Sequence, residues 1–210
     1  MTKETNKLIE ELSKNIESVK IFSPFKLFLI WGISLIAVAL FMVFVVRRED
    51  LWLKLQSGSF FSEIMFAFAT GLFGALAASW LATPDVKQQK WVIWLPFLSL
   101  TFLMMLVAYQ VVIQPVNITE SDFGIGCAVD IFIFIMIPAV ILLFILRKAA
   151  STHNILSSVV AVISVASFGY LCSRLICPND ILEHLILWHY LPILLVAIIA
   201  AFIGAKVLKW

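Results

Sequence analysis

The stretch FKLFLIWGISLIAVALFMVFVV, from Phe25 to Val46, contains a single charged residue. As an α-helix of about 22 residues it would be about 33 Å long, enough to cross a hydrocarbon core of roughly 30 Å. Five apolar stretches of similar length follow it: Ser62–Thr83, Trp91–Ile113, Gly124–Leu146, Ile155–Ile176 and Ile181–Ala205. The sequence therefore predicts an all-α, polytopic membrane protein with a six-helix transmembrane domain over residues 24–210.

The composition supports this class of protein. Of 210 residues, 62% are hydrophobic and 13% are charged, whereas about a quarter of the residues in a soluble domain are charged. The net charge of +2 is too small to indicate nucleic acid binding, so we expect no direct contact with nucleic acid. Three cysteines without a CxxC or a Cys/His finger spacing exclude a disulfide-rich scaffold.

The positive-inside rule orients the chain in the membrane. With the N-terminus in the cytoplasm, 11 of the 15 basic residues lie on the cytoplasmic side, and six spans return the C-terminus to that side. The four basic residues on the outer side are Arg47, Arg48, Lys54 and Arg174. The Arg47–Arg48 pair is followed at once by two acidic residues that offer it ion-pair partners.

The charged segment of residues 1–23 carries the pattern of a short amphipathic helix. Its apolar residues fall on one helical face: Leu8, Ile9, Leu12, Ile16 and Val19. Alone in water such a segment is marginally helical, so the stripe needs a partner. Helices that lie on membranes are usually basic with bulky aromatics, whereas this one is nearly neutral. We therefore interpret residues 1–23 as a cytoplasmic segment that binds a protein.

Small residues mark one side of the second span. Gly71, Gly74, Ala75, Ala78 and Ser79 lie on adjoining faces, and small residues let transmembrane helices approach closely. Such a pattern occurs in dimer interfaces and within bundles. We favour packing within the bundle.

Ionisable residues and thiols concentrate in spans four to six, near the outer face of the membrane. Such residues inside a membrane are rare and usually face the bundle interior. The group comprises Cys127, Asp130, Cys172, Arg174, Cys177, Asp180, Glu183, His184 and His189. Cys172 lies five residues from Cys177, about 140° around a helix, and is expected to point elsewhere.

Three interpretations of this group remain open. Cys127 and Cys177 could form a reversible disulfide in an oxidising compartment. Alternatively, the two thiols, His184 and either Asp130 or Asp180 could bind a soft metal such as zinc. Spacing alone favours a third interpretation, in which the thiols are unpaired small hydrophobes. For His189, a helix–helix hydrogen bond is favoured over a proton relay.

The order of these motifs resembles that of the NrsF-like family of multi-pass bacterial anti-sigma factors, and the resemblance covers nearly the whole chain. A head containing Leu8-Ile9-x-x-Leu12 precedes six spans. The motifs of the second half are, in order, Cys127, Pro138, Leu146-Arg147-Lys148, Cys177-Pro178, Trp188-His189 and Lys209-Trp210. Cys172 has no counterpart in this pattern.

The resemblance implies a function that the residue pattern alone does not give. The head would hold an extracytoplasmic-function sigma factor, and Cys127 and Cys177 would form the sensor pair, with support from Asp130, His184 and His189. We therefore expect a non-enzymatic anti-sigma factor in the bacterial inner membrane, without a cofactor or bound metal, and of open oligomeric state. A membrane thiol oxidoreductase, a metal sensor and a small transporter are the alternatives, although CxxC and an inverted repeat are absent.

Overall fold

The computed structural model describes residues 5, 7, 10, 11, 13, 23–83, 90–113, 124–148 and 153–207. Six helices in these ranges are long and apolar enough to cross a membrane. The predicted all-α six-span fold is therefore confirmed. The apolar stripe of the head, Leu8, Ile9, Leu12, Ile16 and Val19, and the motif Lys209-Trp210 lie outside the described residues.

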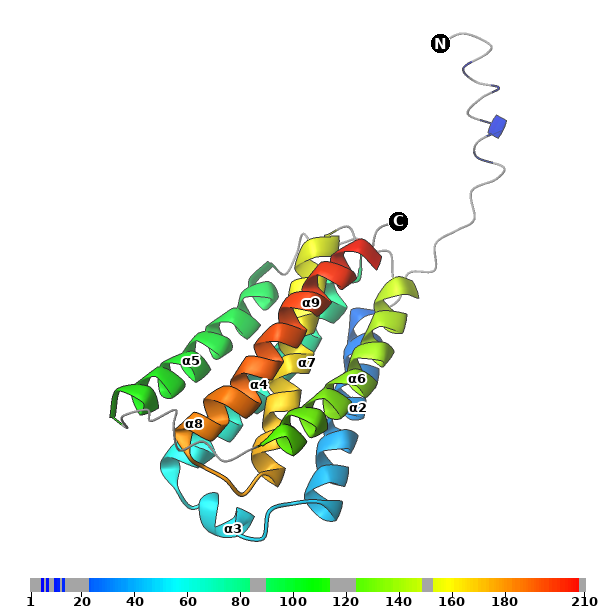
Figure 1. The fold of residues 1–210 in the computed structure, drawn as a ribbon. Helices are drawn as coiled ribbons and strands as arrows, with labels where there is room; N and C mark the ends of the chain where they lie inside the picture. The colour runs from blue at the N-terminus through cyan, green and yellow to red at the C-terminus, as the bar shows by residue number, and fades with distance from the viewer. Residues whose placement is uncertain are drawn as a thin grey trace.

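The helices run up and down in chain order (Figure 1). The elements are α2 (Pro24–Val45), α3 (Leu51–Lys54), α4 (Gly58–Leu81), η2 (Lys90–Trp94), α5 (Leu95–Ile113), α6 (Ile125–Lys148), α7 (Asn154–Ile176), α8 (Leu182–Leu185), η4 (Ile186–Tyr190) and α9 (Leu191–Val207). This alternation places the start of α2 and the end of α9 at one end of the bundle. The ends of α2 and α7 and the starts of α4, α6 and α8 meet at the opposite end, which we call the site end.

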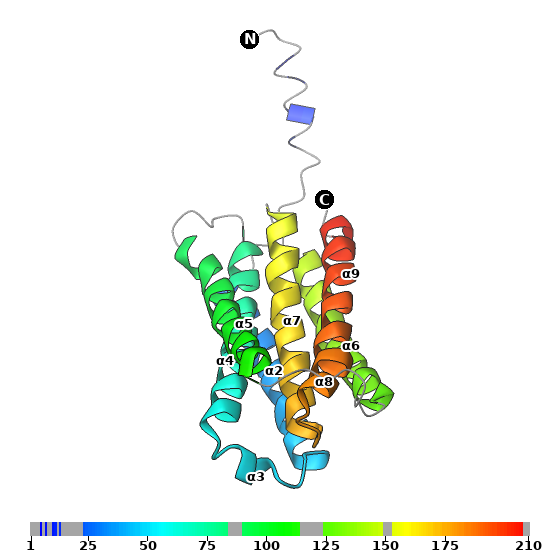
Figure 2. The ribbon, with the colours of Figure 1, turned by 60° about the vertical axis from the view of Figure 1, so that its left-hand side comes forward.

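Helix α7 occupies the middle of the bundle (Figures 1 and 2). It packs against α2, α4, α6 and α9, and most of its residues from Ser157 to Leu175 are buried. The outward faces of the other helices are apolar instead, with side chains such as Phe44 (76% exposed) and Val112 (84% exposed). A hydrocarbon environment satisfies this pattern, whereas water does not.

The small residues of α4 pack inside the bundle, as favoured from the sequence. A Cβ atom added to Gly74 would lie 2.9 Å from the backbone nitrogen of Ser164, and one added to Gly71 would clash with the ring of Phe168. The backbones of α4 and α7 are therefore in close contact. Ser164 donates a hydrogen bond of 2.7 Å to the carbonyl of Gly71 and accepts one of 3.2 Å from Trp31 Nε1. This node joins α2, α4 and α7.

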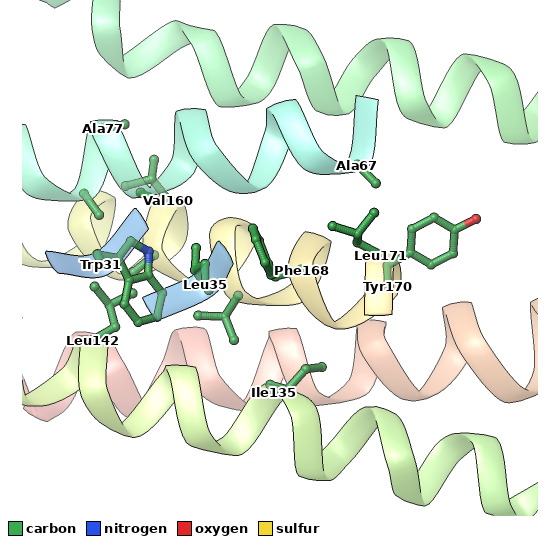
Figure 3. Packing of buried hydrophobic residues seen from close by; sticks show 14 of the residues in the cluster. Trp31, Leu35, Ala67, Ala77, Ile135, Leu142, Val160, Phe168, Tyr170 and Leu171 are labelled. Atoms are coloured by element: carbon green, nitrogen blue, oxygen red, sulfur yellow. The ribbon is translucent and has the colours of Figure 1, made fainter. Parts of the chain in front are cut away.

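The apolar core lies around this node (Figure 3). Trp31 and Leu35 of α2 are fully buried against α7, next to Val160 and Phe168. Tyr170 closes one end of the core and directs its hydroxyl away from the labelled apolar side chains. Beyond that hydroxyl lie the buried charges of Glu63 and Arg174.

Candidate functional site

The two cysteines proposed as sensors lie side by side at the site end. Cys127 is in the first turn of α6, and Cys177 directly follows the last residue of α7. Their Sγ atoms are 3.5 Å apart, and both are free thiols. Because an S–S bond is about 2.05 Å long, a shift of roughly 1.5 Å would join them. Cys177 is buried, and Cys127 is half-buried.

Two histidines complete a cluster with these thiols. His184 of α8 places Nε2 3.5 Å from Cys177 Sγ, and His189 of η4 is fully buried. One donor atom from each of the four side chains lies within 4.8 Å of the others. We call Cys127, Cys177, His184 and His189 the thiol–imidazole cluster.

The two histidines meet because the helix between them is wound more widely than an α-helix. Residues five apart in an α-helix differ by about 140° around the axis. Ile186–Tyr190 instead forms a π-helical turn, whose i→i+5 hydrogen bonds accommodate an extra residue per turn. Pro192 follows this turn, and its ring cannot accommodate the carbonyl of Trp188 at the position that an α-helix would require. The wide turn brings His184 and His189 to the same side.

A hydrogen bond from the central helix holds His189 in place. The Oγ of Ser173, on α7, lies 3.1 Å from Nδ1 of His189. This is the helix–helix hydrogen bond favoured from the sequence. Nε2 of His189 has no hydrogen-bond partner among the described residues.

Beside the cluster lies a network of buried ion pairs. Arg174 of α7 pairs with Glu63 of α4 through Nε and Oε1 at 2.9 Å, and with Asp180 through Nη1 and Oδ1 at 2.9 Å. Tyr170 donates a hydrogen bond to Glu63 and lies 2.6 Å from the hydroxyl of Tyr190. The network therefore links α4, α7 and η4. A cavity of about 610 Å³, large enough for water, borders it between α4, α5 and α8.

Arg48 joins this network to the segment that carries Cys177. Its guanidinium forms paired hydrogen bonds with Asp50 (2.6 and 3.0 Å) and with Asp180 (2.9 and 2.8 Å). It also donates to the carbonyls of Cys177 (2.9 Å) and Pro178 (3.1 Å). The side chain of Arg48 is completely buried. The loop after α2 therefore holds the end of α7 through one arginine.

These contacts set the protonation states of the charged residues in the loops. Burial alone would raise the pKa of Asp180, but hydrogen bonds from Arg48 and Lys54 and the charge of Arg174 outweigh it and hold the pKa well below its usual range. The hydrogen bond from Arg48 likewise lowers the pKa of Asp50. The hydrogen bonds from Arg48 to Asp180 raise the pKa of Arg48 above its ordinary value. All three groups are therefore ionised at neutral pH.

The structure places the remaining sequence candidates apart from the cluster. Asp130 is one turn further along α6 with an exposed side chain, and Asp180 is occupied by arginines. Neither carboxylate belongs to the group of four donors, in which His189 takes the fourth place. Cys172 is buried deeper in α7 and is also outside that group.

Sequence reasoning missed Glu63, Tyr170 and Tyr190 of the network, and it missed the pairing of Arg48 with Asp180. Glu63 is the lone acidic residue of its span and is buried to 1% exposure. The two acidic residues after Arg48 were expected to pair with it, and Asp50 does so, but the bonds from Arg48 to Asp180 were not expected. The available signal for a buried pair was the presence of Glu63 and Arg174 inside two apolar spans, where a charged residue usually pairs with another charged group.

Comparison with known proteins identifies the chain as a regulator. No curated protein and no solved structure matches it. A family model described as NrsF, negative regulator of sigma F, matches residues 12–210, nearly the whole chain. The chain therefore belongs to the NrsF family of negative regulators of sigma F.

Proposed function

We propose that this chain is an inner-membrane anti-sigma factor with both termini in the cytoplasm. It sequesters an extracytoplasmic-function sigma factor through residues 1–23 and keeps it from RNA polymerase. It releases that partner when an envelope or oxidative signal acts on Cys127 and Cys177 at the outer side of the membrane. Membership of a family of regulators favours a non-enzymatic role.

The observation that carries the proposal is the thiol pair across two helices. Cys127 belongs to α6 and Cys177 follows α7, with their sulfurs 3.5 Å apart. A bond between them would tie the start of one helix to the end of another. A signal shifts a two-state bundle only by its differential free energy for the two states. A bond that forms in one arrangement and is absent in the other supplies such a difference.

Release through the thiols is tested with serine substitutions. The Cys127→Ser, Cys177→Ser double variant should insert and hold the sigma factor, but it should no longer release it after oxidant treatment. Cys172→Ser is the matched control, because it removes a buried thiol outside the cluster. A sigma-dependent reporter gene measures release. Normal induction in the double variant would refute the thiol switch.

Binding through the head is tested with charge substitutions on its apolar face. Leu12→Asp with Ile16→Asp removes two apolar anchors, each contributing roughly 1.5–3 kcal/mol on full burial. Co-purification with the sigma factor should fall by orders of magnitude while membrane insertion is unchanged. Ser13→Asp with Glu17→Asp, at the same spacing on the polar side, should have little effect. Undiminished co-purification of the first variant would exclude the stripe as the interface.

Topology is tested with reporter fusions at three positions. Fusions at Lys20, after Asp122 and at Trp210 should report cytoplasm, outside and cytoplasm in that order. An outside signal at Lys20 would contradict the placement of both the head and the cysteines.

A further inference from the structure

The thiol–imidazole cluster has the donor set and the spacing of a tetrahedral metal site. Zinc binds cysteine sulfur at about 2.3 Å and histidine nitrogen at about 2.0–2.1 Å, so the edges of its tetrahedron are roughly 3.4–3.8 Å. The Cys127–Cys177 sulfur pair and the Cys177–His184 pair are both 3.5 Å apart. All four donor atoms lie within 4.8 Å of one another.

The histidines are prepared to act as ligands. His189 is fully buried, and its Nδ1 is engaged by the hydroxyl of Ser173, while Nε2 lacks a hydrogen-bond partner within the described part of the chain. A ring held through one nitrogen with its other nitrogen free is the usual arrangement of a metal-binding histidine. His184 is buried too, and its Nδ1 also lacks a hydrogen-bond partner in the ranges that the structure describes. Buried polar atoms without partners are costly, and a metal ion would satisfy at least one in this cluster.

Charge balance selects the ion. A buried thiolate at Cys177 next to a half-buried one at Cys127 would be strongly disfavoured without a cation. A divalent ion with two thiolates and two neutral imidazoles gives a complex with no net charge, and its formation releases the two thiol protons. Thiolate and imidazole donors in a tetrahedral arrangement favour zinc among the common divalent ions.

We propose that Cys127, Cys177, His184 and His189 bind one Zn²⁺ ion in the reduced protein, with Ser173 positioning His189. Four protein ligands close the coordination sphere, so the ion is structural. The site uses the same two thiols as the proposed switch, and the two states exclude each other. When hydrogen peroxide oxidises the thiolates, their sulfurs form the S–S bond and give up two electrons. The peroxide takes these with two protons to yield two waters, and Zn²⁺ leaves.

The test is metal binding by the full-length chain, purified in detergent under reducing conditions, stripped with a chelator and titrated with Zn²⁺. The wild type and Cys172→Ser should each bind about one zinc per chain by elemental analysis after the titration. His184→Ala and His189→Ala should lose it. Ser173→Ala, which removes no ligand, should weaken binding by about 10–100-fold. Co²⁺ in place of zinc should give the visible absorption of a tetrahedral thiolate complex.

The outcomes separate the zinc site from the thiol switch. A wild type that binds no zinc, or histidine variants that bind it as the wild type does, would overturn the site; the switch would stand if the serine variants still lost oxidant release. Zinc binding that depends on all four ligands supports the site even if the serine variants release the sigma factor normally. Unchanged circular dichroism shows that the histidine variants are folded, and Ser173→Ala tests the site independently of them.

Discussion

Replacing Arg48 by lysine should release the end of α7 while keeping the charge. Arg48 is fully buried and donates six hydrogen bonds, to Asp50, Asp180 and the carbonyls of Cys177 and Pro178. A lysine has three donors, so at least three of these bonds are lost. Their sum at about 1.5–3 kcal/mol each is an upper bound, because the remaining groups rearrange. We take about 3 kcal/mol, the lower end for a broken buried ion pair, because lysine keeps the positive charge.

This free energy applies to the local opening of the segment that carries Cys177. Since 1.4 kcal/mol corresponds to a tenfold change in an equilibrium constant, opening should become roughly 100-fold more populated. The labelling rate of the buried Cys177 thiol follows that population. We therefore expect Arg48→Lys to accelerate labelling by a membrane-impermeant maleimide about 100-fold, measured in a chain with Cys127 and Cys172 replaced by serine.

The neighbouring arginine provides the control. Arg47 is exposed, and its guanidinium lies over the ring of Trp52. Arg47→Lys makes the same chemical change at the adjacent position, and it should leave the labelling rate within a few-fold of wild type. Equal rates for the two lysine variants would refute the role of Arg48 as the anchor of the Cys177 segment.

Two close contacts of glycines and the buried charge of Asp180 lead to three further predictions. In Gly124→Ala the new Cβ would meet the ring of His184 and displace it, so disulfide formation should be slower. Gly126→Ala, which has open space around it, should form the disulfide at the wild-type rate. A gel-shift assay of oxidised protein compares the two variants. Gly74→Ala should force α4 from α7, because the new Cβ meets backbone at 2.9 Å, and should lower the Tm, while Gly32→Ala, whose nearest contact is 4.0 Å, should not. Because the pKa of Asp180 is lower in the folded state than the unfolded value of about 3.9, its stabilising contribution is complete above about pH 5. That contribution is lost progressively as pH falls below about 5, and it is gone once pH has fallen through the folded pKa. Asp180→Asn should therefore show a smaller fall in Tm between pH 6 and pH 3 than wild type, and an equal fall would contradict the assignment.

The spans could be predicted from the sequence because a bilayer imposes one requirement on every residue of a crossing helix. Hydropathy and length report that requirement directly, and α2 begins at Pro24, one residue from the expected Phe25. The start of α4 was predicted less closely. It lies at Gly58, four residues before the expected Ser62, so the predicted span omitted the first turn, which includes Phe60 and Phe61.

The proximity of the site residues depended on information that spacing does not hold. Arg48 and Asp180 are 132 positions apart, and only the packing of the loop after α2 against the end of α7 joins them. The partnership of His184 with His189 was hidden for a different reason. Helical periodicity assumes 3.6 residues per turn, and the π-helical turn violates that assumption at the one place where the site needs it.

The wide turn at Ile186–Tyr190 makes the site sensitive to the number of residues in the segment as well as to their identity. A π-helical turn holds one residue more than the α-helical turn that would replace it. A gene that lost one codon within this segment would still encode an unbroken helix, with α9 in its original register against α7. Loss of Ile186, Leu187 or Trp188 would leave the two imidazoles four residues apart, and loss of Tyr190 would leave them five apart on different faces of an α-helix. A single-residue deletion scan through the segment would therefore separate the fold from the site, which point substitutions at the histidines cannot do without also changing their chemistry.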